Sequence, residues 1–481
     1  MTYEPVIGLE IHAQLLTATK IFCGCSTRFG DPPNSNVCPV CLGLPGALPV
    51  LNRQAVDFAA RAALALGCRV HAHSVFARKN YFYPDLPKGY QISQYDQPLA
   101  TGGRVVVDSG EGARAIGITR VHLEEDAGKS LHEGFLDSDE KTYLDYNRSG
   151  VPLIEIVTEP DLRSAADAAA FFEQLRSLLV WLGVNDGNME EGSLRCDANV
   201  SVRPAGQAAF GTKTEVKNLN SFRYLPKALE HEIERQVDVL ERGGRVVQET
   251  RLWDQGGGRT VAMRSKEEAH DYRYFPEPDL PPVDLSDERR RAIEAGLPEL
   301  PDARRERFVR QYGLPEYDAR ELTRTRALAD YFEAAQASAG NPKAAGNWIM
   351  GEVSRKLNEV GASIEGSAID PEALGGLVRV IDAGTISHNT AKDVFERMWS
   401  TGRTAAAIVR DEGLAQISDE DAIATEVRQV LGRHADAVAQ YRAGKTATFG
   451  FLVGQVMKAM KGKASPRLVN ELLRRELDPP P

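Results

Sequence analysis

Apolar residues occupy every second position in several segments of the first half of the chain, which is the period of a β-strand with one buried face. In residues 6–15 the positions between the apolar ones carry Glu10, His12 and Gln14, and residues 194–202 repeat the pattern. A solvated sheet face explains any one of these strands better than a functional face does. Several strands that carry acids, amides and bases together favour a reactive surface.

Acidic residues mark two further strand patterns. One pattern ends in the adjacent acids Glu124, Glu125 and Asp126, which repel one another unless they are solvated, cap a helix or face a cation. With Glu10 on a comparable face, a shared Mg²⁺ site is the sharper hypothesis and solvation the alternative. Glu155 lies in an otherwise apolar strand, where a structural ion pair and a catalytic role are both open.

Basic and aromatic residues form three more groups. Lys213, Glu215 and Lys217 alternate along one strand, where a cross-strand salt-bridge ladder is the plain explanation. Arg264, Lys266, Arg273 and Tyr274 lie near one another and form a candidate nucleotide clamp, with a surface loop as the alternative.

Residues 76–99 interleave aromatic and basic side chains, among them Lys79 and Tyr81, in what we interpret as a proline-broken loop. Aromatic rings beside Lys and Arg stack on unpaired nucleotides and bind their phosphates. Packing of the aromatic side chains beneath the loop is the alternative.

Helical periods appear at residues 52–66, 164–182 and 224–242, and Ser164 with Asp167 forms a capping box. Strands and helices do not alternate regularly, so the pattern predicts an α+β domain built on an antiparallel sheet.

Prolines between residues 275 and 282 end this first domain, because proline lacks the donor that a helix or a central strand needs. We therefore expect a domain over residues 1–285, a helical domain over residues 286–404 and a helical tail over residues 405–481. No glycine-rich phosphate loop of the Walker or dinucleotide type occurs in the sequence.

The composition, 42% hydrophobic and 26% charged over 481 residues, is that of a globular protein. No segment approaches the roughly 20 apolar residues that span a bilayer, and the N-terminus lacks a secretory pattern, so we expect a cytoplasmic protein. The net charge of −10 argues against indiscriminate binding to nucleic acid. A local basic patch nevertheless lies near the C-terminus and includes Lys445, Lys458, Lys461, Lys463 and Arg467.

Four of the six cysteines, Cys23, Cys25, Cys38 and Cys41, lie within 19 residues of one another. In a reducing compartment this spacing favours a structural zinc site of four thiolates, inserted at residues 23–41, over free buried cysteines. Four protein ligands leave no open position on the metal, so it would hold a loop and not catalyse. The other two cysteines are isolated and are expected to pack in the core.

Long ordered motifs resemble those of the B-subunit family of tRNA-dependent amidotransferases, which act on glutamyl- and aspartyl-tRNA. The matching segments are residues 6–15, 82–93, 122–129, 145–155 and 272–279, and residues 444–446 and 451–458 resemble that family's YqeY-type tail. The resemblance covers essentially the whole chain.

The resemblance implies a first domain related to the glutamine synthetase and guanidino kinase fold, followed by a helical domain and a tRNA-binding tail. It implies that ATP and Mg²⁺ are used to phosphorylate the side-chain carboxylate of a misacylated Glu-tRNA or Asp-tRNA, and that ammonia then displaces the phosphate. The implied partners are a glutaminase A subunit, a small C subunit and the misacylated tRNA.

On this interpretation the candidate catalytic and Mg²⁺-binding residues are Glu10, His12, Glu124 and Glu125. The candidate ATP- and substrate-binding residues are Lys79, Tyr81, Arg195, Arg264, Lys266 and Arg273. The candidate tRNA-binding residues are Lys445, Lys458, Lys461, Lys463 and Arg467.

Two other functions are compatible with parts of the sequence. A noncatalytic tRNA-binding module would use the zinc loop and the basic tail while the chemistry resides elsewhere. A free-standing ligase for small amino acids would act without tRNA, but such an enzyme has no need of the long helical tail.

Overall fold

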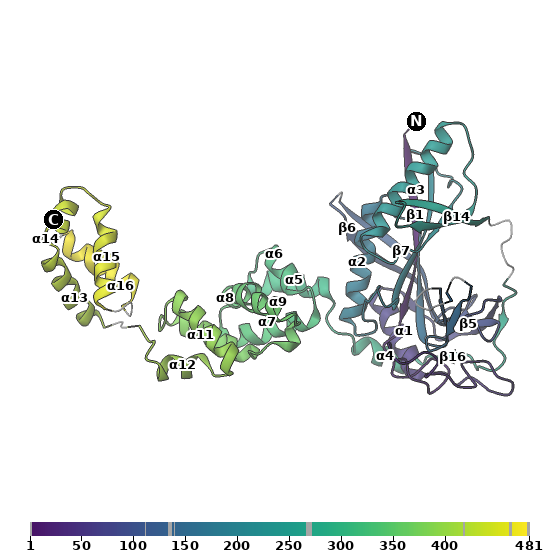
Figure 1. The fold of residues 1–481 in the computed structure, drawn as a ribbon, viewed down its shortest axis with the longest axis horizontal. Coiled ribbons are helices and arrows are strands. Elements are labelled where there is room, and N and C mark those ends of the chain that lie inside the picture. The colour runs from purple at the N-terminus through teal and green to yellow at the C-terminus, as the bar shows by residue number, and fades with distance from the viewer. Residues whose placement is uncertain are drawn as a thin grey trace. The chain divides into compact units, whose positions relative to one another are not determined.

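The computed structural model describes residues 2–110, 112–132, 137–138, 140–265, 272–416, 419–460 and 464–478. The chain divides into two compact units, Met1–Leu300 and Pro301–Pro481 (Figure 1). The first unit mixes a large sheet with helices, and the second unit is helical.

A 12-stranded sheet forms the first unit, with the order β14-β13-β12-β11-β1-β10-β7-β5-β4-β15, while β6 pairs with β7 and β2 pairs with β6. Its strands are β1 (Tyr3–Gln14), β2 (Arg69–Val70), β4 (Phe76–Asn80), β5 (Tyr90–Gln94), β6 (Ala100–Asp108), β7 (Ala113–Glu125), β10 (Pro152–Thr158), β11 (Leu194–Pro204), β12 (Thr214–Lys217), β13 (Glu249–Asp254), β14 (Arg259–Ser265) and β15 (Phe275–Pro276). In the described part of the chain the neighbours pair antiparallel, except for β12 with β13.

Two short sheets accompany the large one. One pairs β3 (His73–Ser74) with β16 (Val283–Asp284), and the other pairs β8 (Lys129–Leu131) with β9 (Tyr143–Asp145). The prediction of a mixed domain built on a mainly antiparallel sheet is confirmed.

The central strand β1 lies between β10 and β11, and its alternation is the predicted one. Ile7, Leu9, Ile11 and Ala13 are buried in the apolar core, so the intervening polar residues share the other face of the sheet. Cross-strand pairing sets the polar side chains of neighbouring strands beside one another on that face.

Three helices complete the apolar core on the apolar face of the sheet. They are α1 (Arg53–Ala65), α2 (Ala165–Trp181) and α3 (Tyr224–Glu241). The predicted cap of α2 is present, because the Ser164 hydroxyl accepts from the Asp167 N–H at 3.0 Å. Asn52 caps α1 in the same way through the N–H of Gln54.

Residues 76–99 are not the single loop that we expected. Phe76–Asn80 and Tyr90–Gln94 pair as a β-hairpin, β4 with β5, and neither strand contains a proline. Phe76 and Ile92 are buried in the core, and this burial outweighs the polar character of the segment. Beside this hairpin, β15 tolerates Pro276 because it is an edge strand.

The first unit continues to Leu300, since the helix α4 (Asp287–Ala295) packs on α1. Arg289 on α4 forms an ion pair with Asp57 on α1 at 2.6 Å, and the indole N–H of Trp181 donates to the Glu299 carbonyl at 2.9 Å. The expected division of the chain into three domains stays a prediction.

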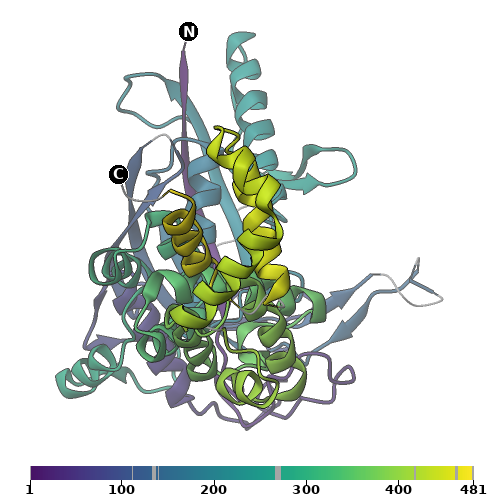
Figure 2. The same ribbon diagram turned by 90° about the vertical axis from the view of Figure 1, so that its left-hand side faces the viewer.

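The second unit contains two groups of helices. The first group is α5 (Pro301–Tyr312), α6 (Glu316–Leu322), α7 (Arg326–Ala339), α8 (Pro342–Trp348), a π-helix η2 (Ile349–Val353), α9 (Ser354–Val360), a 3₁₀ turn η3 (Ile364–Gly366), α10 (Pro371–Asp382), α11 (His388–Thr401) and α12 (Ala405–Asp411). The second group, yellow-green to yellow in Figure 2, is α13 (Glu420–Arg433), α14 (Ala435–Arg442), α15 (Thr448–Ala459) and α16 (Pro466–Leu477), which share an apolar core of their own. None of the helices in the described residues is long and apolar enough to cross a bilayer.

Candidate active site

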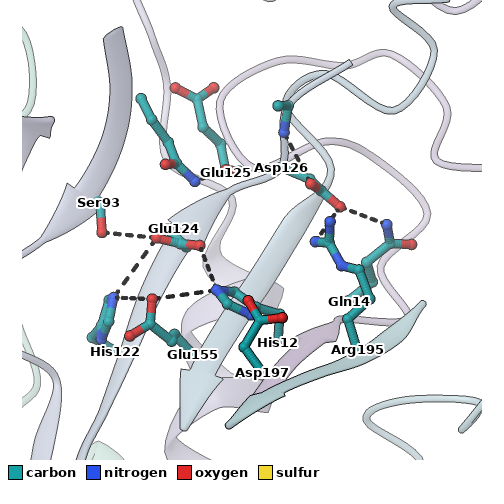
Figure 3. A network of polar contacts seen from close by, with 12 residues as sticks. His12, Gln14, Ser93, His122, Glu124, Glu125, Asp126, Glu155, Arg195 and Asp197 are labelled. Atoms are coloured by element: carbon teal, nitrogen blue, oxygen red, sulfur yellow. Dashed lines mark hydrogen bonds and ion pairs between the residues drawn. The ribbon is translucent and has the colours of Figure 1, made fainter. Parts of the chain in front are cut away.

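Five side chains from three adjacent strands meet on the polar face of the sheet, and Figure 3 labels four of them, His12, His122, Glu124 and Glu155. We call them the acid–histidine cluster: Glu10 and His12 on β1, His122 and Glu124 on β7, and Glu155 on β10. The register explains the meeting, because β1 pairs His12 with Glu155 and β7 pairs His122 with Glu155. The three strands come from separate parts of the sequence, and strand pairing brings their side chains together.

Short contacts tie the cluster together. His12 Nε2 lies 3.4 Å from Glu155 and 3.8 Å from Glu124, and His122 Nε2 lies 3.6 and 3.7 Å from the same two carboxylates. Ser93 on β5 donates a hydrogen bond to Glu124 at 3.0 Å. The two imidazoles therefore bridge the two buried carboxylates.

The buried carboxylates remain negatively charged because of the imidazoles. Burial alone would raise the pKa of Glu155, but the charges of His122 and His12 outweigh it and hold that pKa well below the ordinary value. Burial opposes the ionisation of Glu124 in the same way, and a hydrogen bond from His122 and the charge of His12 lower its pKa.

The pKa values of His12 and Glu10 are raised, in contrast to those of Glu124 and Glu155. Burial would lower the pKa of His12, but the hydrogen bond and charge of Glu155 dominate and raise it to about 9. Burial raises the pKa of Glu10 to about 7, and repulsion by Glu155 adds to this. Carboxylates that lie close together favour protonation of one of them or of a neighbouring base. A metal cation bound between them would replace these protons.

The cluster has the geometry of a cation site. Ligand atoms of Glu10, His12 and Glu155 lie within 4.8 Å of one another, and so do those of His122, Glu124 and Glu155. The three carboxylates are the hard oxygen donors that Mg²⁺ prefers, whereas imidazole is a less usual ligand for it. The carboxylates thus fit Mg²⁺ better than the two histidines do.

Three of the four predicted catalytic residues, Glu10, His12 and Glu124, therefore come together, and Glu125 does not join them. Glu125 forms an ion pair with Lys88 and accepts the Ile92 N–H at 2.8 Å. Its neighbour Glu124 faces the cluster, so the two-residue strand period turns Glu125 to the opposite face. Glu124 and Glu125 are adjacent in the sequence, but their side chains lie on opposite faces of the strand.

Two cluster members are missing from the predicted set. The sequence singles out Glu155 but leaves open whether it forms a structural ion pair or is catalytic. His122 has no predicted role, although it precedes Glu124 by two positions on the same strand. The spacing of two is the signal that could have found His122. Its pairing with Glu155 depends on the strand register, which the sequence does not specify.

Cations flank the cluster on two sides. The ammonium of Lys79, on β4, lies 5.0 Å from the ring centre of Tyr272 and 5.9 Å from that of Tyr81. Burial would lower the pKa of Lys79, but the charges of Glu124 and Glu155 raise it above the ordinary value. Tyr81 donates to Gln91 at 3.2 Å, and burial raises its pKa.

On the other side, Arg195 donates to Asp126 at 2.9 Å, and Gln14 donates to the same carboxylate oxygen at 2.7 Å. The third acid of the triplet therefore has its own partners. Further along this face, Lys217 forms a cross-strand ion pair with Asp197 at 2.8 Å and an ion pair within its own strand with Glu215 at 3.1 Å.

Of the predicted nucleotide clamp, Lys266 and the side chain of Arg264 lie outside the described residues. The carbonyl of Arg273 accepts a hydrogen bond from the Asn80 amide at 2.9 Å, and Arg273 has a φ of 44°. Tyr274 stacks on Tyr95 with ring centres 4.1 Å apart. The clamp stays a prediction.

The four clustered cysteines do converge. The Sγ atoms of Cys23, Cys25, Cys38 and Cys41 lie within 4.8 Å of one another, and Cys38 and Cys41 are 3.9 Å apart. A tetrahedral zinc with Zn–S bonds of about 2.3 Å requires sulfurs about 3.8 Å apart, so the donor set fits zinc. A hydrogen bond from Cys23 is the main cause that lowers the pKa of Cys41 to about 4. As predicted, the other two cysteines, Cys68 and Cys196, are buried in the core.

Comparison with known proteins assigns the chain to a family. The family described as the GatB/GatE catalytic domain matches residues 5–291, and the GatB domain family matches residues 330–477. The B subunit of the aspartyl/glutamyl-tRNA(Asn/Gln) amidotransferase of Myxococcus xanthus (strain DK1622) is 57% identical over 99% of this chain and 98% of its own length. The chain belongs to the GatB family. The protein of the same name in Chlorobium phaeobacteroides (strain BS1) is 56% identical over 99% of this chain and 100% of its own length.

The acid–histidine cluster and the four cysteines both lie within the part that matches the GatB/GatE catalytic domain. The basic patch lies in the second match. Within the patch, Lys445, Lys458 and Arg467 are described by the structure, and Arg467 is 3.9 Å from Glu471. Lys461 and Lys463 lie outside the described residues. In this GatB chain the tRNA-binding role of the patch stays a prediction.

Proposed function

We propose that this GatB chain is the subunit of a glutamyl- and aspartyl-tRNA amidotransferase that activates the side-chain carboxylate of a misacylated tRNA. The carrying observation is the acid–histidine cluster, five convergent titratable side chains inside the region that matches the GatB/GatE catalytic domain. The near-complete match to subunits named for this reaction supports the same substrate.

The chemistry explains why such a cluster is needed. A carboxylate is a poor electrophile until one oxygen becomes part of a leaving group, and transfer of the γ-phosphoryl group of ATP supplies that leaving group. The carboxylates of Glu10, Glu124 and Glu155 would hold Mg²⁺, which offsets the negative charge of ATP and substrate during phosphoryl transfer. His12 and His122 keep two of these carboxylates ionised and oriented.

Lys79 and Arg195 flank the cluster and would contact phosphate or substrate oxygens. Lys79 carries a positive charge stabilised by the cluster's own carboxylates, so its ammonium faces the region where negative charge accumulates. Arg195 is held by Asp126 at 2.9 Å, which fixes the direction of its guanidinium group.

Ammonia would then displace phosphate to leave the amide, which makes the enzyme a carbon–nitrogen ligase with glutamine as the amido donor. In the proposed complex, a heterotrimer, an amidase A subunit releases the ammonia from glutamine and a small C subunit completes the assembly. The first unit would share the fold of glutamine synthetase and the guanidino kinases, and the α13–α16 tail would bind tRNA. The cysteine cluster would hold a structural zinc ion, and the complex would act in the cytoplasm.

Transamidation by the reconstituted complex tests this function. The complex is given Glu-tRNA(Gln) or Asp-tRNA(Asn), with and without ATP, and the amide product is measured. We expect amide formation that requires both ATP and the charged tRNA. Turnover of free glutamate or aspartate without tRNA would instead support a small-molecule ligase. ATP-independent amide formation would contradict the proposal.

A further inference from the structure

Lys20 is a lysine with no solvent-exposed surface, a rare position for a charged side chain. Its ammonium donates to the Asn36 carbonyl at 2.7 Å and to the Tyr146 carbonyl at 3.2 Å. In the described part of the chain no carboxylate forms an ion pair with it. An ammonium removed from water with only neutral acceptors is costly, so a negative charge nearby is needed.

The cysteine cluster can supply that charge. Lys20 lines one cavity together with Cys23, Cys41 and Glu125, and the Glu125 carboxylate is already paired with Lys88. The backbone N–H of Lys20 donates to the Cys25 carbonyl at 3.0 Å. Asn36, which accepts from the ammonium, belongs to the same cysteine loop. A Zn²⁺ ion with four thiolate ligands carries a net charge of about −2, which a buried cation offsets.

We propose that the Lys20 ammonium is the counter-ion of a zinc–thiolate cluster and that it joins this cluster to the segment of residues 146–150. This inference rests on the zinc site of the proposed function. It goes further in naming the residue that sets the metal affinity and the path by which the metal is connected to the acidic strand β7.

The path from Lys20 to β7 is short and consists of hydrogen bonds. The Ile21 N–H donates to the Gly150 carbonyl at 2.9 Å, and the Gly150 N–H donates to the Asp126 carbonyl at 2.9 Å. The Ser149 hydroxyl donates to the Cys41 carbonyl at 3.3 Å. The zinc loop is thereby tied to the residue that follows Glu124 and Glu125.

Zinc affinity of the full-length chain, measured by competition with a chromophoric chelator, tests the inference. Lys20→Met removes the charge and keeps much of the volume, and Lys20→Gln keeps a hydrogen-bond donor without the charge. We expect both to weaken zinc binding about 10- to 100-fold, as loss of an outer-shell partner does. Lys20→Arg restores a charge and is expected to bind zinc more tightly than either. Lys227→Met, at an exposed lysine on α3, is the matched control and should bind like the wild type.

Far-UV circular dichroism identifies any variant that does not fold, and Lys20→Gln replaces Lys20→Met if the latter fails. Wild-type affinity in a folded neutral variant would overturn the inference, as would equal losses in the Arg and Met variants. The absence of zinc from the wild-type chain would overturn it together with the zinc assignment. None of these three results would bear on the amidotransferase function, which the transamidation assay tests separately.

Hydrogen exchange gives a second readout on the wild-type chain. Zinc removal is expected to accelerate exchange in peptides that cover residues 146–150 and to leave the distant strand β6 unchanged. Unchanged exchange in residues 146–150 would contradict the proposed connection to β7.

Discussion

At the residue scale, the cluster shows how one strand face gathers groups whose protonation depends on one another. The alternation of β1 places Glu10 and His12 on one face, and the sequence is sufficient for that. The partnership with Glu155 and His122 depends on strand order and register, which are tertiary properties. Glu125 shows the converse, since an acid adjacent in sequence to a cluster residue forms its ion pair with Lys88 on the other side of the strand.

The effect of one cluster residue on the protonation of another can be measured at His12. Glu155→Gln removes the carboxylate whose hydrogen bond and charge raise the pKa of His12 to about 9. In metal-free protein we expect this pKa to fall toward the ordinary 6.5, because burial then acts with less opposition. Histidine NMR titration, with His12→Gln used to assign the resonance, measures the shift. An unchanged titration in the variant would show that Glu155 is not the controlling partner.

At the element scale, the regular strands and capped helices were predictable and the hairpin was not. The capping box at Ser164 and Asp167 locates the start of α2, because the signal lies within four residues. The prolines near β4 and β5 suggest a loop, whereas burial of Phe76 and Ile92 decides for strands. Local signals identify helix ends, and burial of side chains decides between strand and loop.

The helices α5 and α7 are held together by a charged contact that gives an acid-stability prediction. Glu333 on α7 pairs with Arg304 at 2.5 Å and Arg307 at 2.7 Å on α5. Burial opposes ionisation of Glu333, but the hydrogen bonds from Arg307, Tyr312 and Arg304 lower its pKa to about 2. The contact therefore stabilises the fold fully above the ordinary pKa of 4.5, and this contribution is lost as the pH falls toward 2.

Glu333→Gln should destabilise α5 by about 1–3 kcal/mol at neutral pH, because it leaves the buried Arg304 with one anionic partner fewer. Hydrogen exchange of α5 peptides in the full chain measures the local opening free energy. Glu306→Gln, at an exposed glutamate on α5, is the control. Equal exchange in the two variants, or a Glu333→Gln effect that persists at pH 2, would refute the prediction.

The zinc loop gives a second prediction at this scale. Freshly purified, reduced protein is expected to contain one zinc ion per chain, and Cys38→Ser should reduce the zinc content because three thiolates remain. Cys68→Ser, at a buried cysteine outside the cluster, should leave the zinc content unchanged in folded protein. Elemental analysis measures both, and wild-type protein without zinc would exclude a structural zinc site.

At the scale of the whole molecule, the two units match two separate family domains. We propose that the first unit activates the carboxylate and that the second unit binds tRNA. The first unit carries the acid–histidine cluster, and the last helices carry basic residues on an independent core. The family motifs cover both units, so the sequence is sufficient to identify the family. It is insufficient to show which acids meet, because that depends on how β10 pairs with β1 and with β7.

Deletion of the residues after 404 is expected to weaken tRNA affinity about 10-fold or more, since it removes the basic patch and its phosphate contacts. The chemical step at saturating tRNA should change little, because the cluster lies in the other unit. Filter binding and single-turnover kinetics of the reconstituted complex separate these two effects. Unaltered affinity would refute the assignment of the tail.

We infer that the acid–histidine cluster promotes transfer of the γ-phosphoryl group of ATP to a tRNA-borne carboxylate. The most direct measurement is the formation of ADP from ATP, dependent on misacylated tRNA, by complexes that carry Glu124→Gln or the exposed-site control Glu190→Gln. We predict that Glu124→Gln lowers the rate of ADP formation about 100-fold or more while tRNA binding is retained, and that Glu190→Gln matches the wild type. Wild-type ADP formation by a folded Glu124→Gln complex would show that the cluster is not the site of carboxylate phosphorylation.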